Sequence, residues 1–178
     1  MSSFTPLSLL TQLGLVNVGA TVADLGSGIG TWGLPLARLV GPAGHVYVVE
    51  IQKELLEAVA AKARESSLSN LSYIWGDIET RGGTKIADGI LDVVVVANVL
   101  FQSSAAYSIA LEIKRILKPN GKVLVVEWKD SFNGIGPVPD MVVAPETLVK
   151  IFSEAGFGKV KDVAVGDYHY GIIFRKES

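Results

Sequence analysis

Short apolar runs alternate with stretches of helical periodicity along most of the chain. Five of these runs are continuous or nearly continuous, which is typical of strands in a parallel sheet that is covered on both faces. They are Thr21–Leu25, His45–Glu50, Leu71–Trp75, Leu91–Ala97 and Lys122–Trp128. The alternation predicts βαβ units in one α/β domain that spans residues 1–178.

Helical periodicity occupies most of the intervals, with glycine or proline where several helices would end. The expected helices are Pro6–Leu13, Gly33–Val40, Gln52–Ser66, Ala105–Leu117 and Pro145–Ala155. After the last helix, Lys159–Val165 and Tyr168–Arg175 are rich in β-branched and aromatic residues, with Gly166 and Asp167 between them. This pattern predicts an antiparallel hairpin that closes the edge of the sheet.

Composition narrows the classes of function. The chain has no cysteine and two histidines, which argues against disulfides, thiolate nucleophiles and zinc sites. Its formal net charge is −2 and its basic residues are dispersed, so a nucleic-acid partner is not expected. No apolar run approaches the length that crosses a bilayer, and Met1–Pro6 lacks the features of a secretory signal. We therefore expect a cytoplasmic protein.

The segment Asp24–Gly30, with the sequence Asp-Leu-Gly-Ser-Gly-Ile-Gly, joins the first expected strand to a helix. Glycine lets the backbone turn sharply and approach a ligand, and the free N–H groups of the following helix favour an anion. Gly28, Gly30 and Gly33 also fit the GxGxxG pattern of dinucleotide sites, with Glu50 at the distance of a ribose-binding acid. An NAD(P)-dependent oxidoreductase is therefore one alternative, although the chain leaves no room for a separate substrate domain.

Five segments in order resemble the class I S-adenosylmethionine-dependent methyltransferases. Val22–Gly30 resembles motif I of that family, and the four segments that follow are Val46–Glu50, Trp75–Ile78, Asp92–Phe101 and Ile116–Glu127. The resemblance is greatest to the branch that contains ubiquinone/menaquinone-biosynthesis and arsenite methyltransferases. It implies a Rossmann-like sheet of seven strands with a reversed last strand, and S-adenosylmethionine as the cofactor.

The same resemblance implies roles for individual residues. Glu50 would hold the ribose hydroxyls, Ile51 would lie against the adenine, and Asp77 would meet the adenine amino group. The implied cofactor-binding residues are Asp24, Gly26, Ser27, Gly28, Gly30, Glu50, Ile51, Gly76, Asp77, Ile78 and Asn98. Three of them also have ordinary local explanations, because Asp24 and Asp77 would cap turns and Asn98 would shape a loop.

The acceptor is less well defined by the sequence. We expect a small, apolar or aromatic molecule, and the absence of cysteine argues against arsenite. Four aromatic residues near the strand ends are either core or acceptor pocket: Trp32, Trp75, Phe101 and Trp128. Weak candidates for a base are Glu127, Asp130, Asp140 and His169, and none is assigned as catalytic. A monomer or homodimer is expected, and a non-catalytic interaction module is a second alternative.

Overall fold

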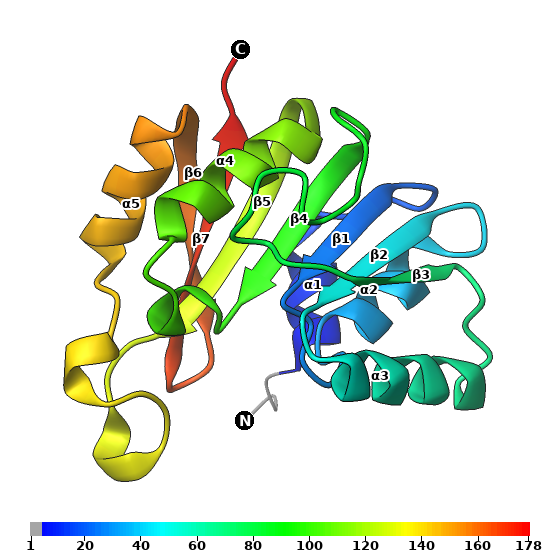
Figure 1. Cartoon of the computed structure of the whole chain (residues 1–178), viewed down its shortest axis with the longest axis horizontal. Helices are drawn as coiled ribbons and strands as arrows, with labels where there is room; N and C mark the ends of the chain where they lie inside the picture. Colours follow the sequence, from blue (N-terminus) through cyan, green and yellow to red (C-terminus); the bar gives the residue numbers. More distant parts are fainter. Residues whose placement is uncertain (1–4) are drawn as a thin grey trace.

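The computed structural model describes residues 5–178 and contains one mixed sheet of seven strands in the order β3-β2-β1-β4-β5-β7-β6 (Figure 1). The strands are β1 (Thr21–Leu25), β2 (His45–Glu50), β3 (Leu71–Trp75), β4 (Leu91–Ala97), β5 (Leu117–Trp128), β6 (Phe157–Val165) and β7 (His169–Lys176). The first five are parallel, and β7 runs antiparallel between β5 and β6. The expected sheet with a reversed last strand is confirmed. Residues 1–4, which hold part of the expected non-secretory start, lie outside the described residues.

Helices cover both faces of the sheet. They are α1 (Pro6–Leu13), α2 (Gly33–Val40), α3 (Lys53–Glu65), α4 (Ala106–Ile116) and α5 (Pro145–Glu154). Buried side chains of α1, α2 and α3 join one hydrophobic core, and those of α4 and α5 join a second core on the opposite face. Strand β4 contributes to both, because Val93 and Val95 point to the first core while Val94 and Val96 point to the second.

Strand β5 begins earlier than the expected Lys122. Leu117 pairs with Leu91, and the register then shifts between Leu91 and Val93. Asn120 has a left-handed φ of 62°, so the segment Pro119–Gly121 is an irregular part of strand β5. The additional bridge at Leu117 was not visible in the sequence.

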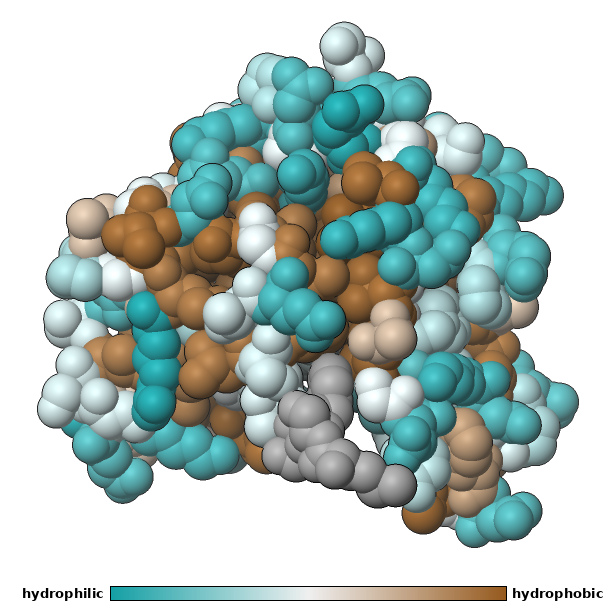
Figure 2. Space-filling view, turned by 180° about the vertical axis from the view of Figure 1, so that it is seen from behind, coloured by the Kyte–Doolittle hydropathy of each residue, from teal (hydrophilic) through white to brown (hydrophobic). Residues whose placement is uncertain are grey.

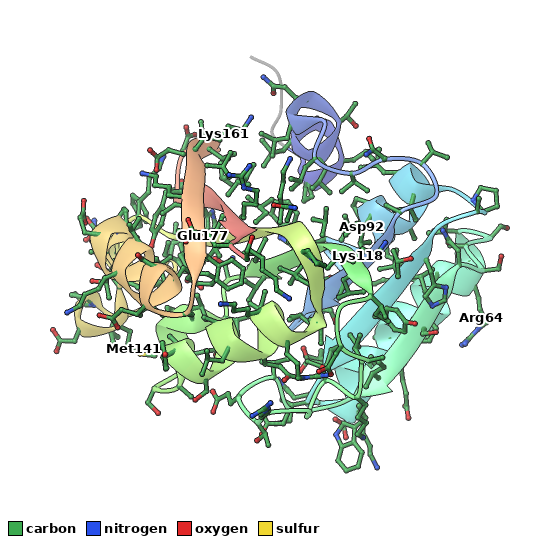
Figure 3. The ribbon with its side chains drawn as sticks, turned by 90° about the horizontal axis from the view of Figure 1, so that it is seen from above. Arg64, Asp92, Lys118, Met141, Lys161 and Glu177 are labelled. Carbon is green, nitrogen blue, oxygen red and sulfur yellow. The ribbon has the colours of Figure 1, made fainter. Side chains whose placement is uncertain are left out.

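The amino ends of the strands are held by the carboxylate of Asp92 on β4. It accepts hydrogen bonds from the Thr21 N–H on β1 at 2.9 Å and from Lys118 Nζ on β5 at 2.7 Å, and Figure 3 shows Asp92 and Lys118 close together. Burial opposes ionisation of Asp92, yet these two partners lower its pKa. Strands β1, β4 and β5 are therefore tied together at the edge opposite the glycine-rich loop.

The back of the molecule carries apolar patches between hydrophilic side chains (Figure 2). Within residues 5–178, every helix is too short or too polar to span a bilayer.

Candidate functional site

A cavity of about 640 Å³ lies beyond the carboxyl ends of the first four strands. Open parallel sheets bind ligands at this edge, and the volume is in the range of small-molecule sites. The cavity brings together nine of the eleven residues expected to bind the cofactor: Gly26, Ser27, Gly28, Glu50, Ile51, Gly76, Asp77, Ile78 and Asn98. Asp24 and Gly30 do not line it.

The glycine-rich loop turns under one wall of the cavity. Gly26 and Ser27 both donate their N–H groups to the Val49 carbonyl, at 2.9 and 3.1 Å. Gly26 has a φ of 69°, and a Cβ there would lie 2.5 Å from Val99 Cγ2, so neighbouring side-chain packing requires this glycine. Gly28 has a φ of 52°, and a Cβ there would meet no protein atom within 4 Å. Gly28 is thus the position at which a ligand would approach the backbone.

Glu50 connects the loop to the end of β2. Its carboxylate is buried, with Oε2 accepting the Gly28 N–H at 2.9 Å. Oε1 accepts the N–H groups of Ile51 and Gln52, at 2.9 and 3.0 Å. An ionised carboxylate has about four acceptor positions. Three are used by the backbone, and Oε2 retains capacity for a donor in the cavity.

Asp24 lies beneath the loop and does not reach the cavity. A Cβ on Gly33 would lie 3.0 Å from Asp24 Oδ2, so this glycine lets the start of α2 approach the carboxyl group. Burial raises the pKa of Asp24 to about 7, the N–H of Gly33 opposes this, and the charge of Glu50 adds to it. The structure therefore places Asp24 as a support for the loop.

Asp77 follows β3, and its surroundings bear on both of the roles expected for it, capping a turn and binding a ligand. Its Oδ1 accepts the Glu79 N–H and its Oδ2 accepts the Thr80 hydroxyl, both at 2.9 Å. The local turn-capping role is therefore present, and each oxygen keeps a second acceptor position toward the cavity that Asp77 lines. Ile51, which is 60% exposed, and Ile78, which is buried, provide apolar surface to the same cavity.

Glu127, at the end of β5, holds the opposite wall in place. Its Oε1 accepts the N–H groups of Val99 and Leu100, at 3.0 and 2.7 Å. Burial raises the pKa of Glu127 to about 7, with those backbone N–H groups opposing the increase. Glu127 lies behind the wall and does not line the cavity, and Asp130 and Asp140 are exposed elsewhere. The candidate carboxylate bases are thus not gathered at the site, and His169 contacts the lining residue Asn98 without lining the cavity itself.

Buried polar atoms without partners are concentrated at this edge of the sheet. Within residues 5–178, the buried side-chain atoms that lack a hydrogen-bond partner are Asp24 Oδ2, Ser27 Oγ, Asn98 Oδ1 and Glu127 Oε2. Buried polar groups in folded proteins are nearly always paired. Two of these atoms belong to residues that line the cavity, Ser27 and Asn98, which indicates that polar groups of a ligand complete this part of the site.

The cavity has further lining residues that sequence reasoning missed. They are Ile29, Thr31, Gln52, Leu55, Glu79, Gln102 and Ser103, among others. Their position in the sequence was the signal that could have identified them, since most lie one to four residues beyond a segment that resembles the methyltransferase family. Ser103 donates its hydroxyl to Glu79 Oε1 at 2.6 Å and joins two of these loops. Among the four aromatic residues considered, Trp32 lines the cavity, whereas Trp75, Phe101 and Trp128 do not.

The residues that the structure describes contain no cluster of three or more His, Cys, Asp or Glu side chains that could hold a metal ion. The polar groups at the cavity are carboxylates, amides, hydroxyls and backbone N–H groups. This set suits an organic ligand that carries hydroxyl and amino groups.

Comparisons with known proteins agree with this site. A family model described as a methyltransferase domain matches residues 17–156. A demethylmenaquinone methyltransferase of Lactococcus lactis is 31% identical over 109 residues, covering 61% of this chain and 42% of that protein. An arsenite methyltransferase of Aquipseudomonas alcaligenes is 37% identical over 109 residues, covering 59% of this chain and 32% of that protein. The chain thus spans less than half the length of either relative.

A solved structure shows the same architecture over nearly the whole chain. The crystal structure of a SAM-dependent methyltransferase from Aquifex aeolicus matches with a TM-score of 0.87 and 27% sequence identity, covering 97% of this chain and 89% of that one. The order of strands, the cavity at their carboxyl ends and the family match all agree. The chain therefore belongs to the methyltransferase domain family, as a member of the class I, S-adenosylmethionine-dependent type.

Proposed function

We propose that this protein transfers the methyl group of S-adenosylmethionine to a small, apolar or aromatic acceptor. One observation carries the proposal: Gly28, Glu50 and Asp77, which come from the carboxyl ends of three strands, converge on a single cavity. Beyond their local contacts, Gly28 leaves space beside the backbone and both carboxylates keep free acceptor positions. A ligand with a nucleoside and an amino-acid part would use all three.

The residues present fit this cofactor. Glu50 would hold the ribose hydroxyls through the free acceptor position on Oε2. Asp77 would accept the adenine amino group, with Ile51 and Ile78 against the ring. The Gly26–Gly28 loop and Asn98 would hold the amino-acid end, where Ser27 Oγ and Asn98 Oδ1 lack partners in the protein.

Positioning is the main task of the protein in such a reaction. When bound, S-adenosylmethionine supplies a methyl group that is already activated on a positively charged sulfonium. The loops after β1, β2, β3 and β4 orient the donor and exclude water on one side of the cavity. Glu127 holds Val99 and Leu100, and with them the wall next to Asn98. We assign no catalytic base, since the candidate carboxylates lie away from the cavity.

The acceptor class rests on the lining and on the relatives. Ile29, Trp32, Leu55 and Val99 give the cavity an apolar part beside its polar groups. The Lactococcus lactis relative is named as a methyltransferase of demethylmenaquinone, a quinone. The other relative is named for arsenite, but this chain has no cysteine to bind a soft arsenic centre. We therefore favour an aromatic hydroxyl compound or quinol over arsenite.

Calorimetry and product release test the proposal together. S-adenosylmethionine and S-adenosylhomocysteine should both bind, whereas NAD⁺ and NADP⁺ should not. Release of S-adenosylhomocysteine should then appear with a quinol or catechol in the acceptor panel and not with arsenite. Binding without turnover across a broad panel would favour the interaction-module alternative. Tight binding of NAD⁺ in place of S-adenosylmethionine would refute the proposal.

A further inference from the structure

Asn98 links the cavity to strand β7. It is the first residue after β4, it has a left-handed φ of 56°, and its N–H donates to the Val126 carbonyl at 2.8 Å. The side chain lines the cavity, and its Nδ2 lies 3.1 Å from His169 Nε2 at the start of β7. Its Oδ1 is buried and has no partner in the protein. The Asn98 amide thus contacts the His169 imidazole through Nδ2 and leaves Oδ1 without a partner.

His169 is held between strand β5 and the neighbouring strand β6. It pairs with Trp128 across the β5–β7 ladder, and the two rings lie with their centroids 4.2 Å apart. Burial lowers the pKa of His169, and the charge of Lys129 lowers it further. The charged or titratable groups around His169 are Glu127 at the end of β5, Lys129 just after that strand, Asp167 and Tyr168 in the turn before β7, and Tyr170 on β7. The surroundings therefore favour the neutral ring at neutral pH.

The hydrogen bond has a definite direction when the ring is neutral. A neutral imidazole has one nitrogen that accepts and one that donates. The amide nitrogen of Asn98 donates, so Nε2 of His169 accepts and Nδ1 carries the proton. If His169 becomes protonated, both of its nitrogens donate, and the amide must turn its oxygen toward the ring. The amide NH₂ would then occupy the place of the free oxygen.

We propose that His169 is a positioning residue that acts through Asn98 and sets the hydrogen-bonding character of the cavity wall. With neutral His169 the buried, unpartnered atom of the Asn98 amide is its oxygen, which can accept a hydrogen bond from an ammonium or hydroxyl group. With protonated His169 the wall presents an NH₂ group, which opposes an ammonium group. The inference rests on the proposed function, because the ammonium group in question belongs to the amino-acid end of S-adenosylmethionine or its demethylated product.

The imidazole can be observed directly without any ligand. Long-range ¹H–¹⁵N spectra of the free protein should show His169 as the Nδ1–H tautomer at neutral pH. The chain has two histidines, so His45, which pairs with Ser72 at 2.8 Å, provides an internal control. Replacement Asn98→Ala should change the His169 signals and leave those of His45 unchanged. An Nε2–H tautomer for His169 in the wild type would overturn the inference.

Binding of S-adenosylhomocysteine supplies the second readout. Calorimetry should show affinity that weakens about tenfold or more as the pH falls and His169 takes up a proton, the size of one lost charge-assisted hydrogen bond. In His169→Gln the glutamine oxygen can accept the Asn98 amide N–H at every pH, so high affinity should persist and this fall should be removed. In His169→Leu no acceptor is left, and affinity should be reduced across the range. His45→Gln should behave like the wild type.

The outcomes separate this inference from the proposed function. An unchanged pH profile in His169→Gln would overturn the role of His169 while binding itself stands. A pH dependence of affinity that remains in His169→Gln would instead be assigned to Asp24 and Glu127, whose pKa values of about 7 fall in the same range. Lack of any S-adenosylhomocysteine binding, with the expected tautomer in the spectra, would contradict the proposed function and the ligand assigned to the wall.

Discussion

Replacement of Glu112 should test how the rim of the cavity is held. Glu112 lies on α4 and its side chain is fully buried. It accepts the Gly82 N–H at 2.8 Å, the Thr84 hydroxyl at 2.6 Å and two N–H groups of Arg115 at 2.8 and 2.7 Å. These bonds tie the segment between β3 and β4 to α4. The same segment begins at Gly76, in the cavity wall, so its anchoring bears on the site.

The pKa of Glu112 gives the size of this contribution. Burial alone would raise the pKa, but the hydrogen bonds from Arg115, Thr84 and Gly82 lower it from 4.5 to about 2. At about 1.4 kcal/mol for each pH unit, the ionised form stabilises the fold by about 3 kcal/mol at neutral pH. Because the pKa is lowered in the folded state, this stabilisation is present above pH 4.5 and is lost as the pH falls through about 2.

Glu112→Gln keeps the shape of the side chain and removes its charge. It turns an NH₂ group toward donors and leaves Arg115, whose side chain is 14% exposed, with Asp88 as its remaining carboxylate. Urea unfolding at pH 7 should show a loss of about 3 kcal/mol, and the difference from the wild type should narrow toward pH 2. Glu57→Gln, on the exposed face of α3, is the control and should change stability by less than about 0.5 kcal/mol. A loss below about 1 kcal/mol, or the same loss at both pH values, would refute the reasoning.

Three further predictions concern the site itself. Gly28→Val should reduce the affinity for S-adenosylhomocysteine more than tenfold, measured by calorimetry, because the valine side chain would enter the cavity. A variant with a native circular dichroism spectrum and unchanged affinity would contradict the assignment of the loop. Glu50→Ala should lower the free energy of unfolding by about 1–3 kcal/mol, since three backbone N–H groups lose their acceptor, and it should weaken binding of the same ligand. A variant as stable as the wild type in thermal denaturation would argue against this. Burial raises the pKa of Glu127 from 4.5 to about 7, so the unfolded chain releases this proton first and stability falls as the pH rises through that interval. Glu127→Gln should show a smaller fall in urea unfolding, and an equal fall would exclude Glu127 as its source.

Most of the sheet could be predicted from the sequence because its central strands are buried on both faces. Strands β1, β2, β3 and β4 have the expected bounds, since continuous apolar runs of that length leave little ambiguity. Most helix ends differ by one residue at most, as capping geometry decides the last residue. Strand β5 starts five residues earlier than expected because a bridge to Leu91 depends on a neighbour 26 residues away in the chain. Periodicity contains no information about such a partner.

Part of the site could also be predicted from the sequence. Residues at strand ends, such as Glu50 and Asp77, could be placed because parallel strands bring their carboxyl ends together. The positions of Asp24 and Glu127 below and behind the cavity depend on how deeply each side chain is buried, which a motif does not specify. The Glu112–Arg115 network was missed, since its contacts to Gly82 and Thr84 cross about 30 residues of chain. The resemblance contributed the cofactor, and the structure distinguished lining residues from supporting ones.

The unpaired buried oxygens at the carboxyl edge also bear on how long the protein persists in a cell. This edge is locally frustrated, because four buried side chains have lost contact with water without gaining a full set of hydrogen-bond partners. They are Asp24, Ser27, Asn98 and Glu127. A ligand in the cavity that supplies partners to Ser27 and Asn98 stabilises the native state, in proportion to the logarithm of its free concentration. Supply of the methyl donor should thereby set the fraction of chains open to proteolysis, so that starvation for the donor shortens the lifetime of the protein itself.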